Sequence, residues 1–195
     1  MYKTQMRFQK LICLFSLIAG AICFLYSLGI MTDLFDSLYS TMRAGDDPNQ
    51  NFVVPGAYVY YEMQGFNRLF TRLSIGLIVV SLLYFITNTN VRRRYYIGNY
   101  IAVGVNVLYS LVFIIWGHVQ IESYKAKFLQ VDFAALKAYA EQWNSYYTDS
   151  TFWFDIHYPV FGIVFILAAL QLVNLFWKRK LMKEEGELIG KEAQA

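Results

Sequence analysis

The sequence predicts an all-α integral membrane protein, a four-transmembrane-helix bundle with helical extracytoplasmic loops. Only 16% of the 195 residues are charged and 57% are hydrophobic, whereas a soluble domain carries about a quarter charged residues. The apolar residues gather in four long uncharged windows, each long enough to cross a bilayer as a helix. We expect a single membrane domain over 1–195, with spans at about 10–31, 69–90, 97–118 and 157–177.

The first span carries a stripe of small residues on one helical face. They are Cys13, Ser16, Gly20, Cys23 and Ser27, at spacings of three and four. Such a stripe lets a neighbouring helix approach closely in lipid. We interpret it as a helix-packing seam, which serves either another helix of the same bundle or a helix of a partner.

The start of the chain also has features of a cleaved signal peptide. A basic leader precedes the apolar segment, and Ala19-Gly20-Ala21 has the small-residue pattern of a cleavage site. However, the uncharged stretch continues from Ile22 to Ile30. This continuation favours a retained anchor helix.

The first long loop, 32–68, is expected to contain helical extensions of its neighbours. Leu34, Leu38 and Met42 continue a helical stripe beyond the first span, and Gly45 is a suitable C-cap. A new helical segment is predicted from about Pro55, which suits a first-turn position. It leads into the second span.

The second long loop, 119–156, also contains a helical pattern. Its apolar stripe is Leu129, Phe133, Leu136, Ala140, Trp143 and Tyr147. Asp132 is placed to cap the second half of this helix. We expect the stripe to pack on the outer region or to lie along the lipid headgroups.

Orientation follows from the basic residues. The N-terminal tail is basic without any acidic residue, the turn 91–96 contains Arg92, Arg93 and Arg94, and the tail 178–195 opens with a basic cluster before a frayed end. Both long loops are net acidic. By the positive-inside rule both termini are cytoplasmic, in the plasma (cytoplasmic) membrane. The three arginines also suit contact with anionic membrane lipid.

Motifs of catalysis are missing from the sequence. It contains no P-loop, GxSxG, HExxH or dinucleotide-binding pattern. Its two cysteines both lie in the first span, which excludes a CxxC centre and a disulfide-stapled outer domain. No charged residue lies in the central part of a span, which argues against a self-contained coupled transporter. We expect no enzyme, no cofactor and no nucleic-acid partner.

Neutral polar residues do occur within the spans. The candidates are Asn99, Asn106, Ser110, Gln171 and Asn174. Their simplest role is structural, namely hydrogen bonding between helices of the bundle. The alternatives are a polar cavity and a contact with the transmembrane helix of a partner.

Two weaker candidates lie near the outer ends of the spans. His118, Glu122, Asp155 and His157 are of the types that bind zinc, but the sequence does not require the two pairs to meet, so no metal site is predicted. An aromatic set offers a candidate surface for a protein partner. It consists of Tyr146, Tyr147, Phe152, Trp153 and Phe154.

Two main functions remain open from the sequence, and a third, weaker option is a membrane enzyme that uses the outer histidines and carboxylates. The first is a non-catalytic accessory or assembly subunit of a larger membrane complex, with a transporter as the favoured complex. It rests on the missing chemistry, the seam and the aromatic outer loops. The second is a self-associating channel or small-molecule facilitator lined by the neutral polar residues.

Overall fold

The computed structural model describes residues 2–31, 54–90, 94–142 and 147–192. Among these residues there are only helices and no strand. The helices are α1 (Tyr2–Met31), α3 (Tyr58–Thr89), α4 (Ile97–Phe128), α5 (Phe133–Gln142), α6 (Phe152–Asp155) and α7 (His157–Glu192). Four of them, α1, α3, α4 and the α6–α7 rod, are long and apolar enough to cross a membrane. The predicted all-α class with four apolar spans is confirmed.

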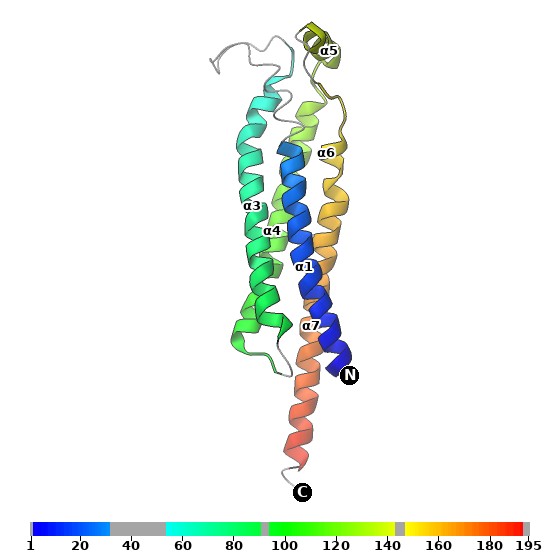
Figure 1. Ribbon diagram of the computed structural model, residues 1–195. Coiled ribbons are helices and arrows are strands. Elements are labelled where there is room, and N and C mark those ends of the chain that lie inside the picture. Colours follow the sequence, from blue (N-terminus) through cyan, green and yellow to red (C-terminus); the bar gives the residue numbers. More distant parts are fainter. Residues whose placement is uncertain (1, 32–53, 91–93, 143–146, 193–195) are drawn as a thin grey trace.

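The four long helices run side by side and alternate in direction (Figure 1). Helix α1 packs on α3 and α7, and α4 packs on the same two helices. The ring α1–α3–α4–α7 is therefore an up-and-down bundle. Both ends of the chain lie at one end of the bundle (Figure 1). We name this the inner end and the opposite one the outer end, after the orientation that the sequence predicts.

The helices are longer than the predicted spans. Helix α1 begins at Tyr2, and α4 continues past His118 to Phe128. Helix α7 continues to Glu192, where the sequence predicted a frayed tail. Ion pairs of the i,i+4 type, Lys180–Glu184 at 4.0 Å and Lys183–Glu187 at 3.8 Å, support this last part. The predicted extension through Met42 to Gly45 lies outside the described residues.

A turn and a short helix close the outer end. Gly56 has a φ of +79°, and a Cβ there would lie 2.7 Å from the carbonyl oxygen of Gln130, so only glycine fits. The N–H of Asp132 donates to the Pro55 carbonyl at 3.1 Å. The Asp132 Oδ1 accepts from the first backbone N–H groups of α5 at 3.1 and 3.0 Å, which confirms the predicted cap. Leu136 of α5 is fully buried, so this helix packs on the bundle.

Stacked aromatic rings fill the outer half of the core. Phe70 of α3 stacks on Phe66 at 5.4 Å and on Phe113 of α4 at 5.2 Å between ring centroids. Tyr26 of α1 and Phe161 of α7 meet Phe70 edge-on. All four long helices therefore meet in one aromatic cluster. In lipid such close packing is a main source of helix association.

The small residues of α1 lie inside the bundle. All five of the seam are buried. A Cβ added to Gly20 would lie 3.3 Å from the Ile78 Cα of α3. Nearer the outer end of the same contact, the hydroxyls of Ser27 and Ser74 are 3.1 Å apart. The seam thus faces helices of its own bundle, and α3 occupies the place that a partner's helix would need.

Replacing Gly20 with leucine is expected to destabilise the bundle. The larger side chain would have to displace the α3 backbone at Ile78, and such overpacking costs about 1–3 kcal/mol. The measurement is the apparent melting temperature in detergent, followed by tryptophan fluorescence. The matched control is Gly104→Leu on α4, where an added Cβ meets no atom within 4 Å. Equal melting temperatures for the two variants would contradict this packing.

Candidate functional site

A layer of polar side chains joins all four long helices at mid-bundle. The Gln171 amide of α7 donates to the Ser16 hydroxyl of α1 at 3.0 Å and to the Asn106 Oδ1 of α4 at 2.8 Å. The Asn106 amide in turn donates to the Ser81 hydroxyl of α3 at 3.0 Å. All four residues are buried. We call this set, Ser16, Ser81, Asn106 and Gln171, the polar layer.

The polar layer borders a very small cavity. Its volume is about 10 Å³, and Gly20 and Ser110 also line it. A space of about 10–15 Å³ holds a single water molecule. The sequence-predicted residues Asn106, Ser110 and Gln171 therefore come together, but the space between them has no room for a larger solute.

Asn99 serves the start of α4. Its Oδ1 accepts from the backbone N–H of Tyr96 at 2.8 Å, and its amide donates to the Thr87 carbonyl at the end of α3, at 2.7 Å. Asn99 thus fixes the short turn between the two helices. It lies at the inner end, far along α4 from the polar layer.

A second polar cluster at the inner end contains residues that the sequence analysis did not single out as a site. The Gln5 amide donates to Asn174 at 2.8 Å and to Gln9 at 2.9 Å. Lys178 is completely buried, donates to the Gln5 Oε1 at 3.3 Å and lies over the rings of Tyr2 and Tyr95. The signal was present, because Gln5 and Gln9, like Asn174 and Lys178, are four apart and share a helical face.

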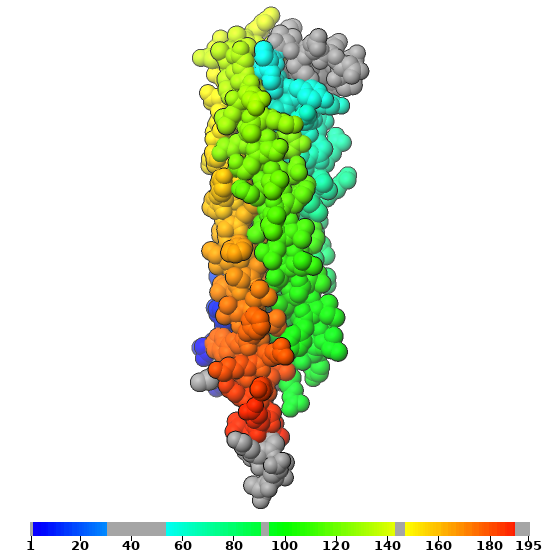
Figure 2. Space-filling model, turned by 180° about the vertical axis from the view of Figure 1, so that it is seen from behind, coloured from blue at the N-terminus to red at the C-terminus, as the bar shows by residue number. Residues whose placement is uncertain are grey.

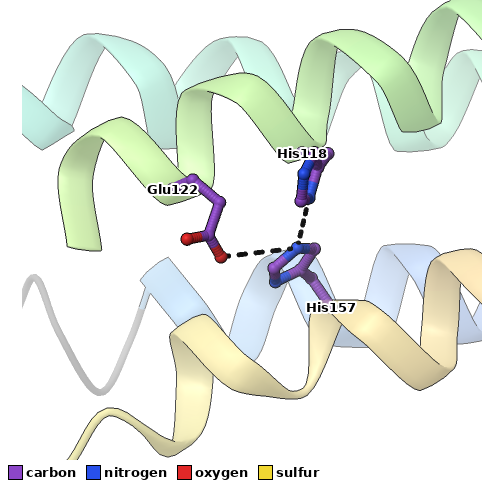
Figure 3. A group of neighbouring side chains, drawn as sticks. All are labelled: His118, Glu122 and His157. Carbon is purple, nitrogen blue, oxygen red and sulfur yellow. Dashed lines mark hydrogen bonds and ion pairs between the residues drawn. The ribbon is translucent and has the colours of Figure 1, made fainter. Parts of the chain in front are cut away.

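Three of the four metal candidates meet at the outer end. His118 and Glu122 project from α4 toward His157 at the start of α7 (Figure 3). The His118 Nδ1 and the His157 Nε2 are 2.8 Å apart, and the His157 Nε2 is 3.8 Å from the Glu122 Oε1. One ligand atom from each residue lies within 4.8 Å of the others. We call these residues the outer triad.

Neighbouring groups orient the outer triad. His157 is 1% exposed, and its Nδ1 is hydrogen-bonded to the Phe154 carbonyl. The hydroxyl of Tyr158 donates to the Glu122 Oε1 at 2.8 Å. The ring of His157 is therefore fixed on one side, and its Nε2 faces the other two members.

Asp155, the fourth candidate, takes no part in the outer triad. Its carboxylate bonds the Lys125 ammonium at 2.5 Å and the Thr151 hydroxyl at 2.6 Å. This pair links the outer part of α4 to the residues that precede α7. The contact with the Lys125 ammonium keeps the Asp155 carboxylate away from the two histidines.

The aromatic set does not form the continuous surface that the sequence suggested. Phe154 is completely buried beneath Phe128, and the Trp153 ring lies over Gly29 of α1. Tyr147 is half-buried, whereas Phe152 is exposed. Tyr146 lies outside the described residues. Glycine at position 29 lets the indole reach the core, so most of this set packs within the protein.

The arginine turn is described only in part. Arg94 is exposed at the inner end, which suits contact with solvent or lipid headgroups. Arg92 and Arg93 lie outside the described residues.

A hollow between α3 and α4 at the outer end was missed by the sequence analysis. Its volume is about 540 Å³. Tyr58, Tyr61 and Arg68 of α3 line one side, and Tyr124 and Lys127 of α4 line the other. The Lys127 ammonium bonds the Glu62 carboxylate at 2.5 Å across it. Tyrosines spaced three apart on α3, with Arg68 two turns further on, were the available signal.

Comparison with models of known families, with curated proteins and with solved structures gave no match. The fold itself defines the class: over the residues that the structure describes, the protein is helical, and four of these helices are long and apolar enough to cross a membrane.

Removing the Gln171 amide is expected to destabilise the bundle through its partners. Gln171→Leu removes the donor from the buried Ser16 hydroxyl and from the Asn106 Oδ1, which costs about 1–3 kcal/mol. Asn106→Leu should cost a similar amount, whereas the double variant should lose less than the sum, with a coupling of about 0.5–1.7 kcal/mol. Unfolding by SDS titration measures all three. Strictly additive losses would contradict a direct contact between the two amides.

Proposed function

We propose that this chain is a non-catalytic membrane protein that acts as an accessory or assembly subunit of a larger membrane complex, such as a transporter. It resides in the plasma membrane with both termini in the cytoplasm. The observation that carries the proposal is the outer hollow lined by tyrosines and Arg68.

The interior supports a structural role for the bundle. Gln171, Asn106, Ser81 and Ser16 bond one another, and the cavity beside them fits about one water. Polar residues that line a conducting path need to face an open space. Here they hold four helices in register, which favours the assembly role over the alternative of a self-associating channel or facilitator.

The outer hollow has the composition of a protein interface. Tyrosine and arginine are enriched among the residues that dominate binding energy, because they offer large contact area and hydrogen bonds together. Tyr58 is 48% exposed, and its ring is tilted against that of Tyr61 with 5.6 Å between centroids, so two rings lie on one side of the hollow. The Glu62–Lys127 pair, which joins α3 to α4 across the hollow, supplies charge. A protein segment with apolar and hydrogen-bonding side chains fits this lining.

The distribution of charge supports the proposed orientation. At the inner end Lys3, Arg7, Arg94, Arg179 and Lys180 are exposed. At the outer end the lysines nearest the bundle, Lys125 and Lys127, are paired with carboxylates. A cluster of exposed basic residues at one end of the spans is typical of the cytoplasmic side.

The proposal predicts a partner whose binding depends on the hollow. The chain carries an affinity tag and is expressed at native level, then extracted in mild detergent and analysed by quantitative mass spectrometry. We expect one membrane protein at a fixed stoichiometry. Tyr61→Ala combined with Arg68→Glu should reduce its recovery at least tenfold, because both changes remove contacts of the hollow.

Phe152→Ala is the control for this measurement. It also removes an exposed aromatic at the outer end, but it lies outside the lining of the hollow, so recovery of the partner should be unchanged. A partner that is retained by the double variant, or a chain that purifies alone and monodisperse from its native membrane, argues against the proposal.

The purified chain alone is expected to give no solute flux. Liposomes that contain it should retain glycerol, small amino acids and monovalent ions as well as empty liposomes do, since the polar layer encloses room for about one water. Stopped-flow light scattering and ion-sensitive dyes measure this. Flux that disappears in Asn106→Leu would instead support the channel alternative.

A further inference from the structure

The only two histidines of the sequence meet at one point of the fold. They are 39 residues apart in the chain, yet their rings lie side by side with Glu122 beside them (Figure 3). We propose that His118, Glu122 and His157 form a binding site for Zn²⁺. This inference does not depend on the assembly role proposed above.

The donor set matches zinc chemistry. Two imidazoles and one carboxylate are the protein ligands of a familiar class of zinc sites, in which a fourth position is left for water or another ligand. Neutral imidazole nitrogen and carboxylate oxygen suit a borderline divalent ion better than Ca²⁺ or Mg²⁺, which prefer oxygen alone.

The spacing of the donors is close to that of a tetrahedral site. With metal–ligand bonds of about 2.0–2.1 Å, neighbouring ligand atoms in a tetrahedron are about 3.3 Å apart. In the protein the His118 Nδ1 and the His157 Nε2 are 2.8 Å apart, and the His157 Nε2 and the Glu122 Oε1 are 3.8 Å apart. Shifts of about half an ångström bring both distances to the required value. The donor atoms of His118 and Glu122, which lie within 4.8 Å of each other, have to move closer together as well.

The imidazole of His157 is already in the tautomer that a metal needs. Its Nδ1–H donates to the Phe154 carbonyl, which leaves a lone pair on Nε2. Ligating histidines generally donate their second ring N–H to a carbonyl or carboxylate, which fixes the ring orientation. The His118 Nδ1–H now donates to this lone pair. When the metal takes that position, His118 ligates through Nδ1 and carries its proton on Nε2.

The Glu122 carboxylate also has a hydrogen-bond donor that orients it. The Tyr158 hydroxyl donates to its Oε1, which orients the carboxylate toward the histidines. The nearby cation, Lys125, is bonded to Asp155, so its charge is largely balanced. The metal would therefore enter a site with one carboxylate charge of its own.

Both histidines also border an apolar groove of about 350 Å³ between α4 and α7, lined further by Phe161 and Phe165. Ligand exchange with the surroundings is thus open from this side. Because His118 and Glu122 belong to α4 and His157 to α7, a bound ion would link the outer ends of two helices.

The experiment measures metal binding by the full chain in detergent. The tag must contain no histidine, since the chain has only two. After treatment with a chelator, the protein is incubated with equimolar Zn²⁺ and gel-filtered, and the metal is quantified by plasma mass spectrometry. Co²⁺ serves as the spectroscopic probe. We expect one ion per chain, and visible d–d bands of a four-coordinate Co²⁺ complex.

Variants keep the test independent of folding. His157 is buried, so the test uses the half-exposed Glu122 and the exposed His118: Glu122→Gln and His118→Asn should each weaken Zn²⁺ affinity at least 100-fold. Tyr158→Phe should weaken the Zn²⁺ affinity about 10-fold, because it removes the hydroxyl that orients Glu122. Glu62→Gln changes another carboxylate of the outer end, which is bonded to Lys127, and should bind as the unmodified chain does.

Absence of stoichiometric Zn²⁺ in the unmodified chain overturns the proposal. So does retention by Glu122→Gln and His118→Asn at unmodified affinity, since the ion would then lie elsewhere. Neither outcome affects the outer hollow, whose partner is tested by Tyr61 and Arg68. A melting temperature that Zn²⁺ raises in the unmodified chain, but not in these variants, supports the site.

Discussion

The register of the four helices depends on the hydrogen bonds that the Gln171 amide donates. This amide bonds Ser16 and Asn106 directly and, through Asn106, reaches Ser81, so one side chain connects four helices. In lipid the hydrophobic effect does not drive helices together, so interhelical hydrogen bonds and close packing specify how they align. Once this layer is aligned, Gly20 stands opposite Ile78 and Ser27 opposite Ser74. The polar layer thus determines which small residue meets which backbone.

Much of the fold follows from the sequence because its signals are local. Uncharged windows, the spacing of Cys13 to Ser27 and the capping position of Asp132 all depend on neighbours within one helix. The ends of the helices were less predictable. The apolar segment of α7 ends before Lys178, but the helix continues because ion pairs between its own side chains stabilise it in water. The meeting of His118 with His157 could not be predicted, since it depends on the relative height of α4 and α7. Phe154 was misjudged for a similar reason, because burial of an aromatic near a span depends on tertiary contacts that composition does not reveal.

The two ends of the bundle stabilise charged side chains in different ways. At the inner end a buried cation, Lys178, is surrounded by an amide oxygen and two aromatic rings. Amide dipoles and ring faces stabilise a cation, and the Glu185 carboxylate adds an attractive charge. At the outer end charges are paired across helices, as in Lys125–Asp155 and Lys127–Glu62. The inner end therefore holds a buried cation among polar and aromatic groups, whereas the outer end pairs charges of opposite sign between helices.

Helix α7 is longer than the hydrocarbon core of a bilayer is thick. It is 36 residues long, about 54 Å at 1.5 Å per residue, whereas the hydrocarbon core of a bilayer is about 30 Å thick. The remainder projects from the inner end (Figures 1 and 2). The Tyr2 hydroxyl of α1 still bonds Glu185 at 3.0 Å, and the part beyond it runs as a single helix. Its exposed side chains include Lys180 and Lys183, followed by Glu184 and Glu187. Such a helix works as a stiff spacer: whatever binds its far part is held at a fixed height above the bilayer surface, and each inserted turn would raise that height by about 5.4 Å.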